Sequence, residues 1–270
     1  MGSSYKPDAN NFGKDAPLVN LEELPSWILQ EDDDLLVINK PGWLVCHPSK
    51  NGPLSSLVGA CREYTGLERL HLISRLDRET SGLILLAKRP ALARQLQTAV
   101  EKQLSKKLYL TVLRGEMQQD RHVDAMLGRD TQSLVHVKQA VRTDGIGKAA
   151  QTLFHPIYAY NGYTLAQVQI LTGRKHQIRA HALHIGHPVA GDKIYGPDDL
   201  LYLDFIDDGW TDRHEELLEM KRQALHAWQL SIQCESGDFH FTAPVPDDMR
   251  ELCIRIFGHF PDLPESQEST

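Results

Sequence analysis

Alternation of apolar and polar residues with a period of two constrains this fold more than any other sequence feature. The segment Tyr163–Leu171 alternates cleanly, as a strand with one buried face does. Leu108–Arg114 follows the same pattern, and Leu225–Gln233 with Phe239–Ala243 predicts a hairpin that turns at Ser236–Asp238. Helical segments are interspersed without a regular strand–helix–strand rhythm. We therefore expect an α+β fold with a mixed, mainly antiparallel central sheet and flanking helices.

Shorter signals place the remaining elements. Strands are predicted at Leu35–Asn39, Leu83–Ala87, Ser133–Val137 and Thr152–Phe154, and helices at Pro53–Tyr64, Pro90–Leu104, Lys175–Ile185 and Asp248–Phe257. The first residues lack periodicity and are rich in Asn, Gly, Ser and Pro. We expect a flexible lead-in over residues 1–24, a single domain over 25–258 and a flexible tail over 259–270.

The formal charge of −7 argues against a partner that is a polyanion, but the charges are unevenly distributed. Residues 61–115 carry a net +6 and residues 172–193 a net +3, whereas residues 194–270 carry −12. Screening limits charge effects to about 8–10 Å, so a phosphate backbone responds to a local basic face. Ordinary solvated Lys and Arg side chains remain the alternative interpretation.

Several classes of protein are disfavoured by what the sequence lacks. Its longest apolar runs are too short to cross a bilayer, and the N-terminus shows no export signal, so we expect no membrane partner. The four cysteines are scattered, without a C-x-x-C pair. We interpret them as reduced thiols of a cytoplasmic protein.

The segment Ser74–Gly82 places Asp77 between Arg75 and Arg78, just before a predicted buried strand. Flanking arginines favour the ionised carboxylate, which is then available as a nucleophile or base. The alternative is a surface ion-pair cluster at the start of the strand.

A second segment, Leu171–Arg179, ends a strand at a glycine turn and begins a helix rich in donors. Helix N-terminal amides together with Arg174 and Lys175 are suited to bind phosphate or carboxylate. Arg174 and Arg179 are five positions apart, so one can face an active-site carboxylate while the other faces a phosphate. The alternative is a capped amphipathic helix with solvated basic side chains.

The nearby histidines raise the hypothesis of a metal-dependent hydrolase. His181, His184 and His187 are three residues apart, but the predicted helix ends at Gly186, and the only nearby carboxylate is Asp192. We therefore expect no metal, and we interpret these side chains as RNA contacts or packing residues.

Taken together, the motifs resemble the RluA-type family of pseudouridine synthases. The blocks that carry the resemblance are Leu35–Ser49, Ser74–Lys88, Lys106–Gly115, Gly147–Phe154, Leu171–His181, Gly186–Gly196 and Leu225–Pro244. Their order and spacing agree over roughly residues 30–245. The RLD-x-x-TSG and TGR-x-HQ-I-R blocks occur together and are highly specific.

The resemblance implies the pseudouridine synthase fold with an active-site cleft across the middle of the sheet, and it assigns roles. Asp77 matches the catalytic aspartate, which acts as the glycosidic bond of uridine breaks before the uracil rejoins ribose through C5. Arg75 matches an arginine that fills the space left by the flipped base. Tyr109 matches the tyrosine that stacks on the uracil and assists proton removal from C5, and Arg179 matches the arginine that pairs with the aspartate.

Arg174, Lys175 and His176 lie in a matching block and are expected to bind the substrate. Ser74 departs from the family, which usually has histidine at this position. The resemblance further implies an RNA substrate, a stem-loop of rRNA or tRNA, without cofactor or metal. We expect a monomer without the separate N-terminal RNA-binding domain of many relatives, because the Lys40–Gly42 block comes so early. The alternative is a non-catalytic RNA-binding relative of the same fold.

Overall fold

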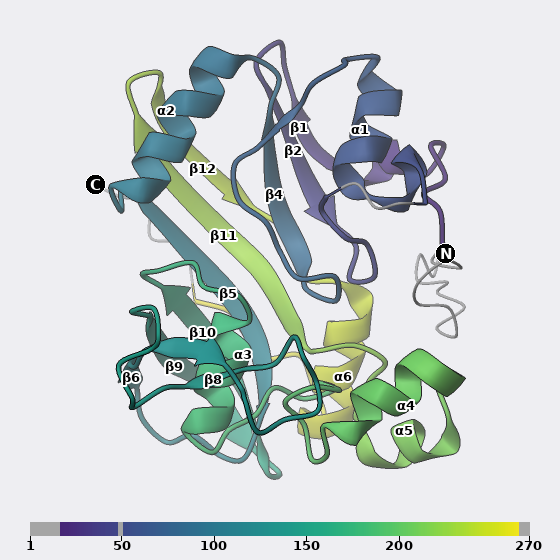
Figure 1. Cartoon of the computed structure of the whole chain (residues 1–270), viewed down its shortest axis with the longest axis vertical. Helices are drawn as coiled ribbons and strands as arrows, with labels where there is room; N and C mark the ends of the chain where they lie inside the picture. The colour runs from purple at the N-terminus through teal and green to yellow at the C-terminus, as the bar shows by residue number, and fades with distance from the viewer. Residues whose placement is uncertain (1–16, 48–50, 265–270) are drawn as a thin grey trace.

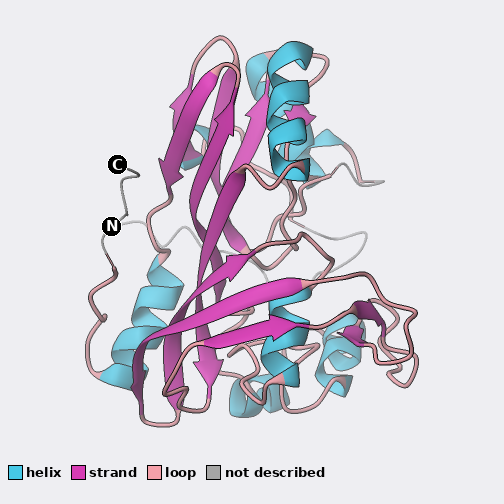
Figure 2. Ribbon diagram, turned by 90° about the vertical axis from the view of Figure 1, so that its left-hand side faces the viewer, coloured by secondary structure: helices cyan, strands magenta, loops and turns pink. Residues whose placement is uncertain are grey.

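The structure, a computed structural model, describes residues 17–47 and 51–264. A long, twisted sheet runs through the molecule, and helices lie on both of its sides (Figure 1, Figure 2). The strands are β1 (Ile28–Glu31), β2 (Leu35–Lys40), β3 (His71–Leu72), β4 (Ser81–Ala87), β5 (Ser105–Arg114), β6 (Arg121–Asp124), β7 (Leu127–Arg129), β8 (Gln139–Val141), β9 (Gln151–Tyr160), β10 (Tyr163–Ile170), β11 (Leu225–Cys234) and β12 (Gly237–Thr242). The helices are η2 (Leu24–Trp27), η3 (Pro53–Ser55), α1 (Leu57–Thr65), α2 (Pro90–Glu101), α3 (Gln177–His184), α4 (Leu200–Asp208), α5 (Asp212–Leu217) and α6 (Asp247–Phe257). None of the described helices is long and apolar enough to cross a membrane.

The main sheet has ten strands in the order β1-β2-β4-β11-β5-β10-β9-β6, with β3 beside β4 and β12 beside β11. The paired strands of this sheet are antiparallel, except that β4 and β11 are parallel. A separate two-stranded ribbon is formed by β7 and β8. The structure confirms the predicted mixed, mainly antiparallel sheet with flanking helices.

The parallel junction between β4 and β11 places the loop before β4 near the middle of the sheet. Ser81 and Gly82 pair there with His226 and Ala227. Gly82 has a φ of +109°, and a Cβ on it would lie 2.2 Å from the carbonyl oxygen of Ala227. Only glycine permits both this conformation and this close approach of the two backbones.

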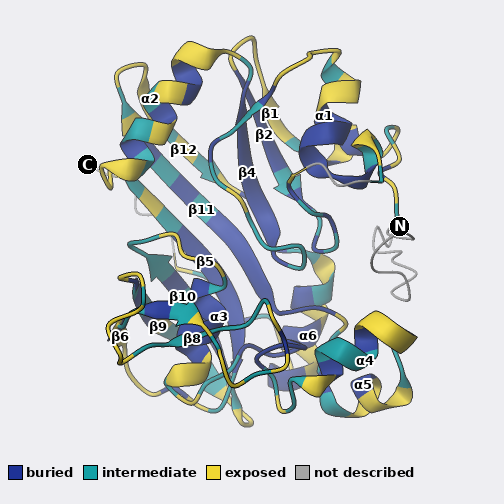
Figure 3. Cartoon of the chain, viewed as in Figure 1, coloured by how far each residue is buried: buried dark blue, intermediate teal, exposed yellow. Residues whose placement is uncertain are grey.

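Strand β5 lies between β11 and β10 and is mostly buried (Figure 1, Figure 3). Its two faces contribute to different parts of the core. Leu108 and Leu110 pack with Trp228 and with Met249 of α6. Tyr109 points to the opposite face, because side chains alternate along a strand, and belongs to the core cluster that includes buried residues of α2 and α3. This second face of β5 is the one that borders the site described below.

Several sequence predictions of local structure are wrong. The helix predicted over Pro53–Tyr64 is broken at Ser56 between η3 and α1, and the helix predicted over Pro90–Leu104 ends at Glu101. Residues Ser133–Val137 form bends and a turn instead of a strand. The Asp130 carboxylate accepts the amides of Gln132 and Ser133, and the Ser133 hydroxyl accepts the amide of Val135, so local hydrogen bonds replace pairing with a strand. Helix α3 begins at Gln177 and not at Lys175, because His176 has a left-handed backbone conformation with φ 54°.

At both ends the packed part of the chain extends beyond the domain bounds expected from the sequence. The predicted lead-in covers residues 1–16, which lie outside the described residues, and a segment in which Val19 and Leu24 are buried. In the predicted tail, Phe260 and Leu263 pack against the core, and residues 265–270 lie outside the described part.

Candidate active site

Asp77 lies in the loop that connects β3 with β4. The amide of Thr80 donates to the carbonyl oxygen of Asp77 over 3.2 Å and closes a turn. The sulfur of Cys46 lies 3.4 Å from both the amide nitrogen and the carbonyl oxygen of Leu76. These contacts hold the backbone on both sides of Asp77, whose side chain keeps 28% of its surface exposed.

Lys40, at the end of β2, is hydrogen-bonded to the same loop. Its ammonium donates to the carbonyl oxygens of Pro41 and Leu44 at 2.8 Å and to that of Arg78 at 3.0 Å. These three acceptors match the three donors of an ammonium. The side chain is fully buried, and this burial lowers the pKa of Lys40 to about 8. Lys40 therefore anchors the loop that carries Asp77.

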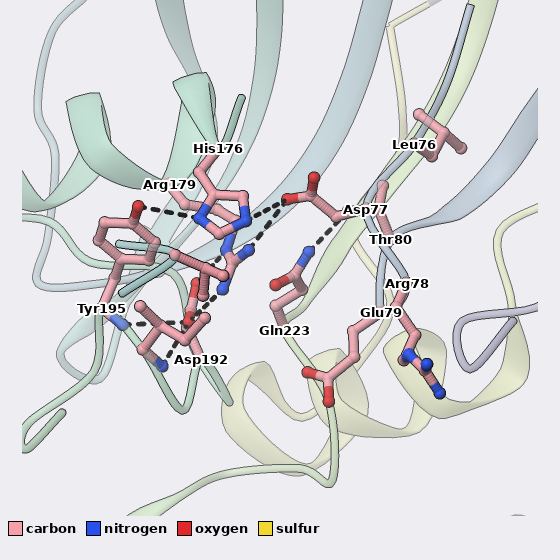
Figure 4. Close-up of polar contacts among 12 residues, drawn as sticks. Leu76, Asp77, Arg78, Glu79, Thr80, His176, Arg179, Asp192, Tyr195 and Gln223 are labelled. Carbon is pink, nitrogen blue, oxygen red and sulfur yellow. Dashed lines mark hydrogen bonds and ion pairs between the residues drawn. The ribbon is translucent and has the colours of Figure 1, made fainter. Parts of the chain in front are cut away.

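Arg179 joins two carboxylates that are far apart in the sequence (Figure 4). Its Nη1 lies 2.9 Å from Asp77 Oδ2. Its Nε and Nη2 lie 2.6 and 2.8 Å from the two carboxylate oxygens of Asp192. Such a bidentate pair defines both the position and the plane of a guanidinium. The Asp77–Arg179 contact is the geometry that the family resemblance implies, whereas sequence analysis gave Asp192 no role.

Asp192 is itself held by the backbone that follows it. Its Oδ1 accepts the amides of Ile194 and Tyr195 at 2.9 and 3.1 Å, and its side chain is fully buried. Burial raises the pKa of Asp192, but the charge and hydrogen bonds of Arg179 outweigh burial and bring this pKa below its ordinary value. The carboxylate is therefore a fixed anion that orients Arg179. The only sequence signal for it is its place in the Gly186–Gly196 block.

The pKa of Asp77 results from opposing effects. Burial raises the pKa, but His176 and Arg179 lower it by more than burial raises it, so the net pKa of Asp77 lies below the ordinary value. Burial and Arg179 in turn lower the pKa of His176 to about 4, so this ring is neutral near neutral pH. The permanent charge that keeps Asp77 ionised there is consequently that of Arg179.

His176 and Tyr195 complete the surroundings of Asp77 (Figure 4). The Tyr195 hydroxyl oxygen accepts the amide of Gln139 at 2.7 Å and lies 3.0 Å from His176 Nδ1. His176 Nε2 lies 3.8 Å from Asp77 Oδ2, so the tautomer with its proton on Nε2 turns an N–H towards that carboxylate and leaves Nδ1 to accept the Tyr195 hydroxyl proton. The Arg179 guanidinium also stacks over the Tyr195 ring, 4.9 Å from its centroid.

Gln177 organises the turn between β10 and α3. Its amide oxygen accepts the Thr172 hydroxyl and the amide of Arg174, at 2.8 and 3.0 Å. Its amide nitrogen donates to the Gln151 carbonyl oxygen and to the Thr152 hydroxyl. Arg174 and Lys175 lie in this turn and are exposed. The Arg174 Nε donates to the Ala149 carbonyl oxygen at 2.9 Å.

The structure brings all seven predicted site residues to one pocket of about 260 Å³. They are Arg75, Asp77, Tyr109, Arg174, Lys175, His176 and Arg179. Tyr109 is buried, and burial together with the charge of Asp77 raises its pKa, so its phenol is neutral. Arg75 is exposed and has no polar partner among the described residues. The pocket also contains Lys107, which sequence analysis did not single out.

Two of the three histidines considered as metal ligands are occupied by other contacts, and the third, His184, is exposed. His181 is fully buried, with Nδ1 2.8 Å from the Thr152 hydroxyl and Nε2 3.0 Å from the Ala125 carbonyl oxygen. His187 Nδ1 lies 3.0 Å from the Arg114 carbonyl oxygen. Across residues 17–47 and 51–264, no three His, Cys, Asp or Glu side chains are grouped as metal ligands would be. His181 therefore acts as a packing residue.

Comparisons with known proteins point to one family. A sequence model of the family described as RNA pseudouridylate synthase matches residues 34–184. The ribosomal large subunit pseudouridine synthase D of Nitrosomonas europaea is 35% identical over 250 residues, which cover 88% of this chain and 68% of that protein. An uncharacterized RNA pseudouridine synthase of Bacillus subtilis, YjbO, is 35% identical over 238 residues, with 86% and 76% coverage.

Solved structures show the same fold. The human RNA pseudouridylate synthase domain containing 1 superposes with a TM-score of 0.68 at 23% identity, covering 89% of this chain and 91% of that one. The human RNA pseudouridylate synthase domain containing 4 gives the same TM-score and identity, with 91% and 97% coverage. The predicted fold class is thereby confirmed.

Proposed function

The chain belongs to the RluA-type family of RNA pseudouridine synthases and is an isomerase, and we propose that it converts loop uridines of structured RNA to pseudouridine with Asp77 as its catalytic carboxylate. The reaction breaks the bond between N1 of uracil and C1′ of ribose and forms one between C5 and C1′. The proton on C5 is lost and N1 gains one. Atoms and electrons balance within the nucleotide, so the chemistry requires no oxidant or reductant.

The observation that carries this proposal is the 2.9 Å contact between Asp77 and Arg179 at the wall of a pocket. An ionised carboxylate can act on the ribose or the base as the glycosidic bond breaks. Arg179 keeps Asp77 ionised and oriented while 28% of the Asp77 side chain remains exposed. The surrounding buried residues limit the access of water, which strengthens the electrostatic effect of the carboxylate on the reacting atoms.

Tyr109 and Arg75 supply the other two parts of the proposed mechanism. The Tyr109 ring offers a stacking platform for uracil, and its neutral phenol relays the C5 proton, taking it on the hydroxyl oxygen while the hydroxyl proton passes to water in the pocket. Arg75 is exposed and unpaired among the described residues, so it is free to enter the RNA stack and replace the flipped base. Unstacking a base costs a few kcal/mol, and an inserted side chain offsets part of that cost.

The RNA target that we propose first is the large ribosomal RNA, with tRNA as the second candidate. Support comes from the relatives, several of which are ribosomal large subunit pseudouridine synthases. Arg174 and Lys175, exposed at the rim of the pocket, are suited to hold phosphates on either RNA without reading sequence. Ser74, which stands where the family usually has histidine, lines the same pocket and is a candidate determinant of the target.

The test is pseudouridine mapping of cellular RNA with and without the gene, followed by complementation with Asp77→Asn. We expect a site that vanishes with the gene, returns with the wild type and stays absent with the variant. Purified Asp77→Asn should still bind the RNA, because the substitution keeps the shape of the side chain. Modification by Asp77→Asn at the wild-type rate would exclude the carboxylate role, and an unchanged map together with no modification in vitro would exclude the proposed activity.

A further inference from the structure

Lys107 has a position in the pocket that the roles described so far do not use. It lies on β5 two residues before Tyr109, so both side chains are on the same face of the strand. Both line the 260 Å³ pocket together with Asp77. The preceding residue, Lys106, is exposed and points to the opposite face of the strand.

Lys107 is half-buried and lacks the polar partners that the two buried lysines, Lys40 and Lys193, have. In the described part of the chain it makes no hydrogen bond and no ion pair, and two apolar side chains, Val100 and Ile170, line the pocket with it. By contrast, Lys40 donates to three carbonyl oxygens, and Lys193 lies 2.9 Å from a carboxylate oxygen of Glu79. Withdrawal of a charged group from water without compensation is unfavourable, and burial lowers the pKa of Lys107 to about 8. Such an uncompensated ammonium is available to a ligand.

The charges around Lys107 indicate what that ligand carries. The titratable and charged groups that share the pocket are Arg75, Asp77, Tyr109, Arg174, Lys175, His176 and Arg179. Asp77 is the only carboxylate among them, and it is paired with Arg179, whose guanidinium also binds Asp192 outside the pocket lining. The residues paired with Lys107 on β10 and β11, Ile170 and Leu230, carry no charge. Basic side chains therefore outnumber the one carboxylate of the pocket, so the surroundings of Lys107 are electropositive, and no carboxylate pairs with Lys107 among the described residues.

We propose that Lys107 binds a phosphodiester group next to the target uridine and so positions the nucleotide over Tyr109. This inference rests on the proposed function, because it takes RNA as the ligand. The phosphate is the anionic part of RNA, and a lysine acts on it as a point charge through a strong hydrogen bond. The arrangement assigns Lys107 to substrate binding, separate from the carboxylate chemistry of Asp77.

The experiment measures binding in an Asp77→Asn background, where the RNA is not consumed, with a labelled RNA stem-loop that has one uridine in its loop. At pH 7 we expect Lys107→Gln to weaken binding about tenfold and to lower the slope of log Kd against log salt by about 1. Lys107→Arg should bind like the parent. Unchanged affinity and salt slope in Lys107→Gln would overturn the proposal.

The pH dependence separates a charge effect from a change in packing. The RNA affinity of the parent protein, which retains Lys107, should decrease between pH 7 and pH 9.5 towards that of Lys107→Gln. The reason is that the Lys107 ammonium loses its proton above about pH 8. The guanidinium of Lys107→Arg stays charged, so its affinity should remain constant over this range. Since Lys40 also has a pKa of about 8, an equal decrease in Lys107→Arg would assign the pH effect to Lys40 and overturn the charge role of Lys107.

A neutral linkage identifies the contacted group. Replacing the phosphates that flank the uridine by methylphosphonates should abolish the difference in RNA affinity between the parent protein and Lys107→Gln. The control variant Lys106→Gln should lose as much affinity on this replacement as the parent protein does. If the difference persists with neutral linkages, the amine contacts a base carbonyl and the phosphate assignment is wrong. Failure of the proposed function is read separately, as absence of modification by the wild type.

Discussion

Asp192 holds Arg179 by two hydrogen bonds of 2.6 and 2.8 Å, and this leaves the remaining nitrogen of the guanidinium to face Asp77 at 2.9 Å. Arg179 and Asp192 are both buried, and two backbone amides also donate to the Asp192 carboxylate. The orientation of the proposed catalytic carboxylate thus depends on a second carboxylate that does not line the pocket.

We predict that Asp192→Asn lowers kcat about 100-fold with little change in KM, because a misoriented Arg179 affects the reaction more than RNA binding. Loss of a buried charge partner should also lower the free energy of unfolding by about 3 kcal/mol. Urea unfolding and single-turnover kinetics measure the two effects. The matched control is Asp248→Asn, which breaks another bidentate pair of 2.6 and 2.8 Å, with Arg222, outside the pocket. Equal loss of kcat in both variants would contradict the positioning role.

The neutral state of His176 predicts a dependence of stability on pH. Its pKa is about 4 in the folded protein and about 6.5 in the unfolded chain. The unfolded chain therefore binds more protons between pH 4 and 6.5, and the stability decreases as the pH falls through this window, by up to about 3 kcal/mol. His226 has a similarly lowered pKa, so the measurement is the difference between the wild type and His176→Gln. The variant should lose less stability over this window, and equal slopes would exclude a buried neutral His176.

Tyr195→Phe should remove the hydrogen bond that holds the His176 ring while leaving His176 itself in place. The substitution leaves the Gln139 amide and His176 Nδ1 without their hydroxyl partner, at a cost of about 1–2 kcal/mol in the free energy of unfolding. We expect kcat to fall several-fold and the tautomer of His176, observed by nitrogen NMR, to become mixed. A single Nε2–H tautomer that persists in the variant would show that Tyr195 does not determine it.

Gly82→Ala should disrupt the parallel junction of the sheet. The new Cβ would lie 2.2 Å from the Ala227 carbonyl oxygen, on a residue with φ +109°, so we expect a loss of about 3 kcal/mol or more. Gly66→Ala is the control, because Gly66 also has a positive φ, +68°, but nothing lies within 4 Å of its Cβ position. That substitution should cost about 1 kcal/mol. Chemical denaturation distinguishes the two, and similar losses would refute the role of backbone approach at Gly82.

Arg75→Ala should affect RNA modification without affecting the fold. Arg75 is exposed and makes no polar contact with described residues, so the free energy of unfolding should change by less than about 0.5 kcal/mol. If its side chain replaces the flipped base, kcat/KM should fall about tenfold or more, and least for an RNA in which the target uridine is already unpaired. An equal effect on paired and unpaired uridines would argue against this role.

Much of the fold was predictable because local rules and global packing agree in its long elements. The period-two pattern of β10 and the turn of the β11–β12 hairpin place these strands within one or two residues of the observed bounds. The prediction fails at Ser133–Val137, where Val135 is buried but side-chain hydrogen bonds bend the backbone. It misses β1, whose burial pattern gives it no clear apolar face.

The candidate site residues could be named from their motifs, because Asp77, Tyr109 and the Leu171–Arg179 block stand in specific sequence contexts, and all seven predicted residues line one pocket. How these side chains contact one another follows from the fold. Arg179 meets Asp77 across 102 positions and Asp192 across 13, and no sequence periodicity encodes that triangle. That Lys107 has no polar partner among the described residues likewise depends on the neighbours that pack around β5. Pairing and burial are properties of the space around a side chain, and that space exists only once the chain has folded.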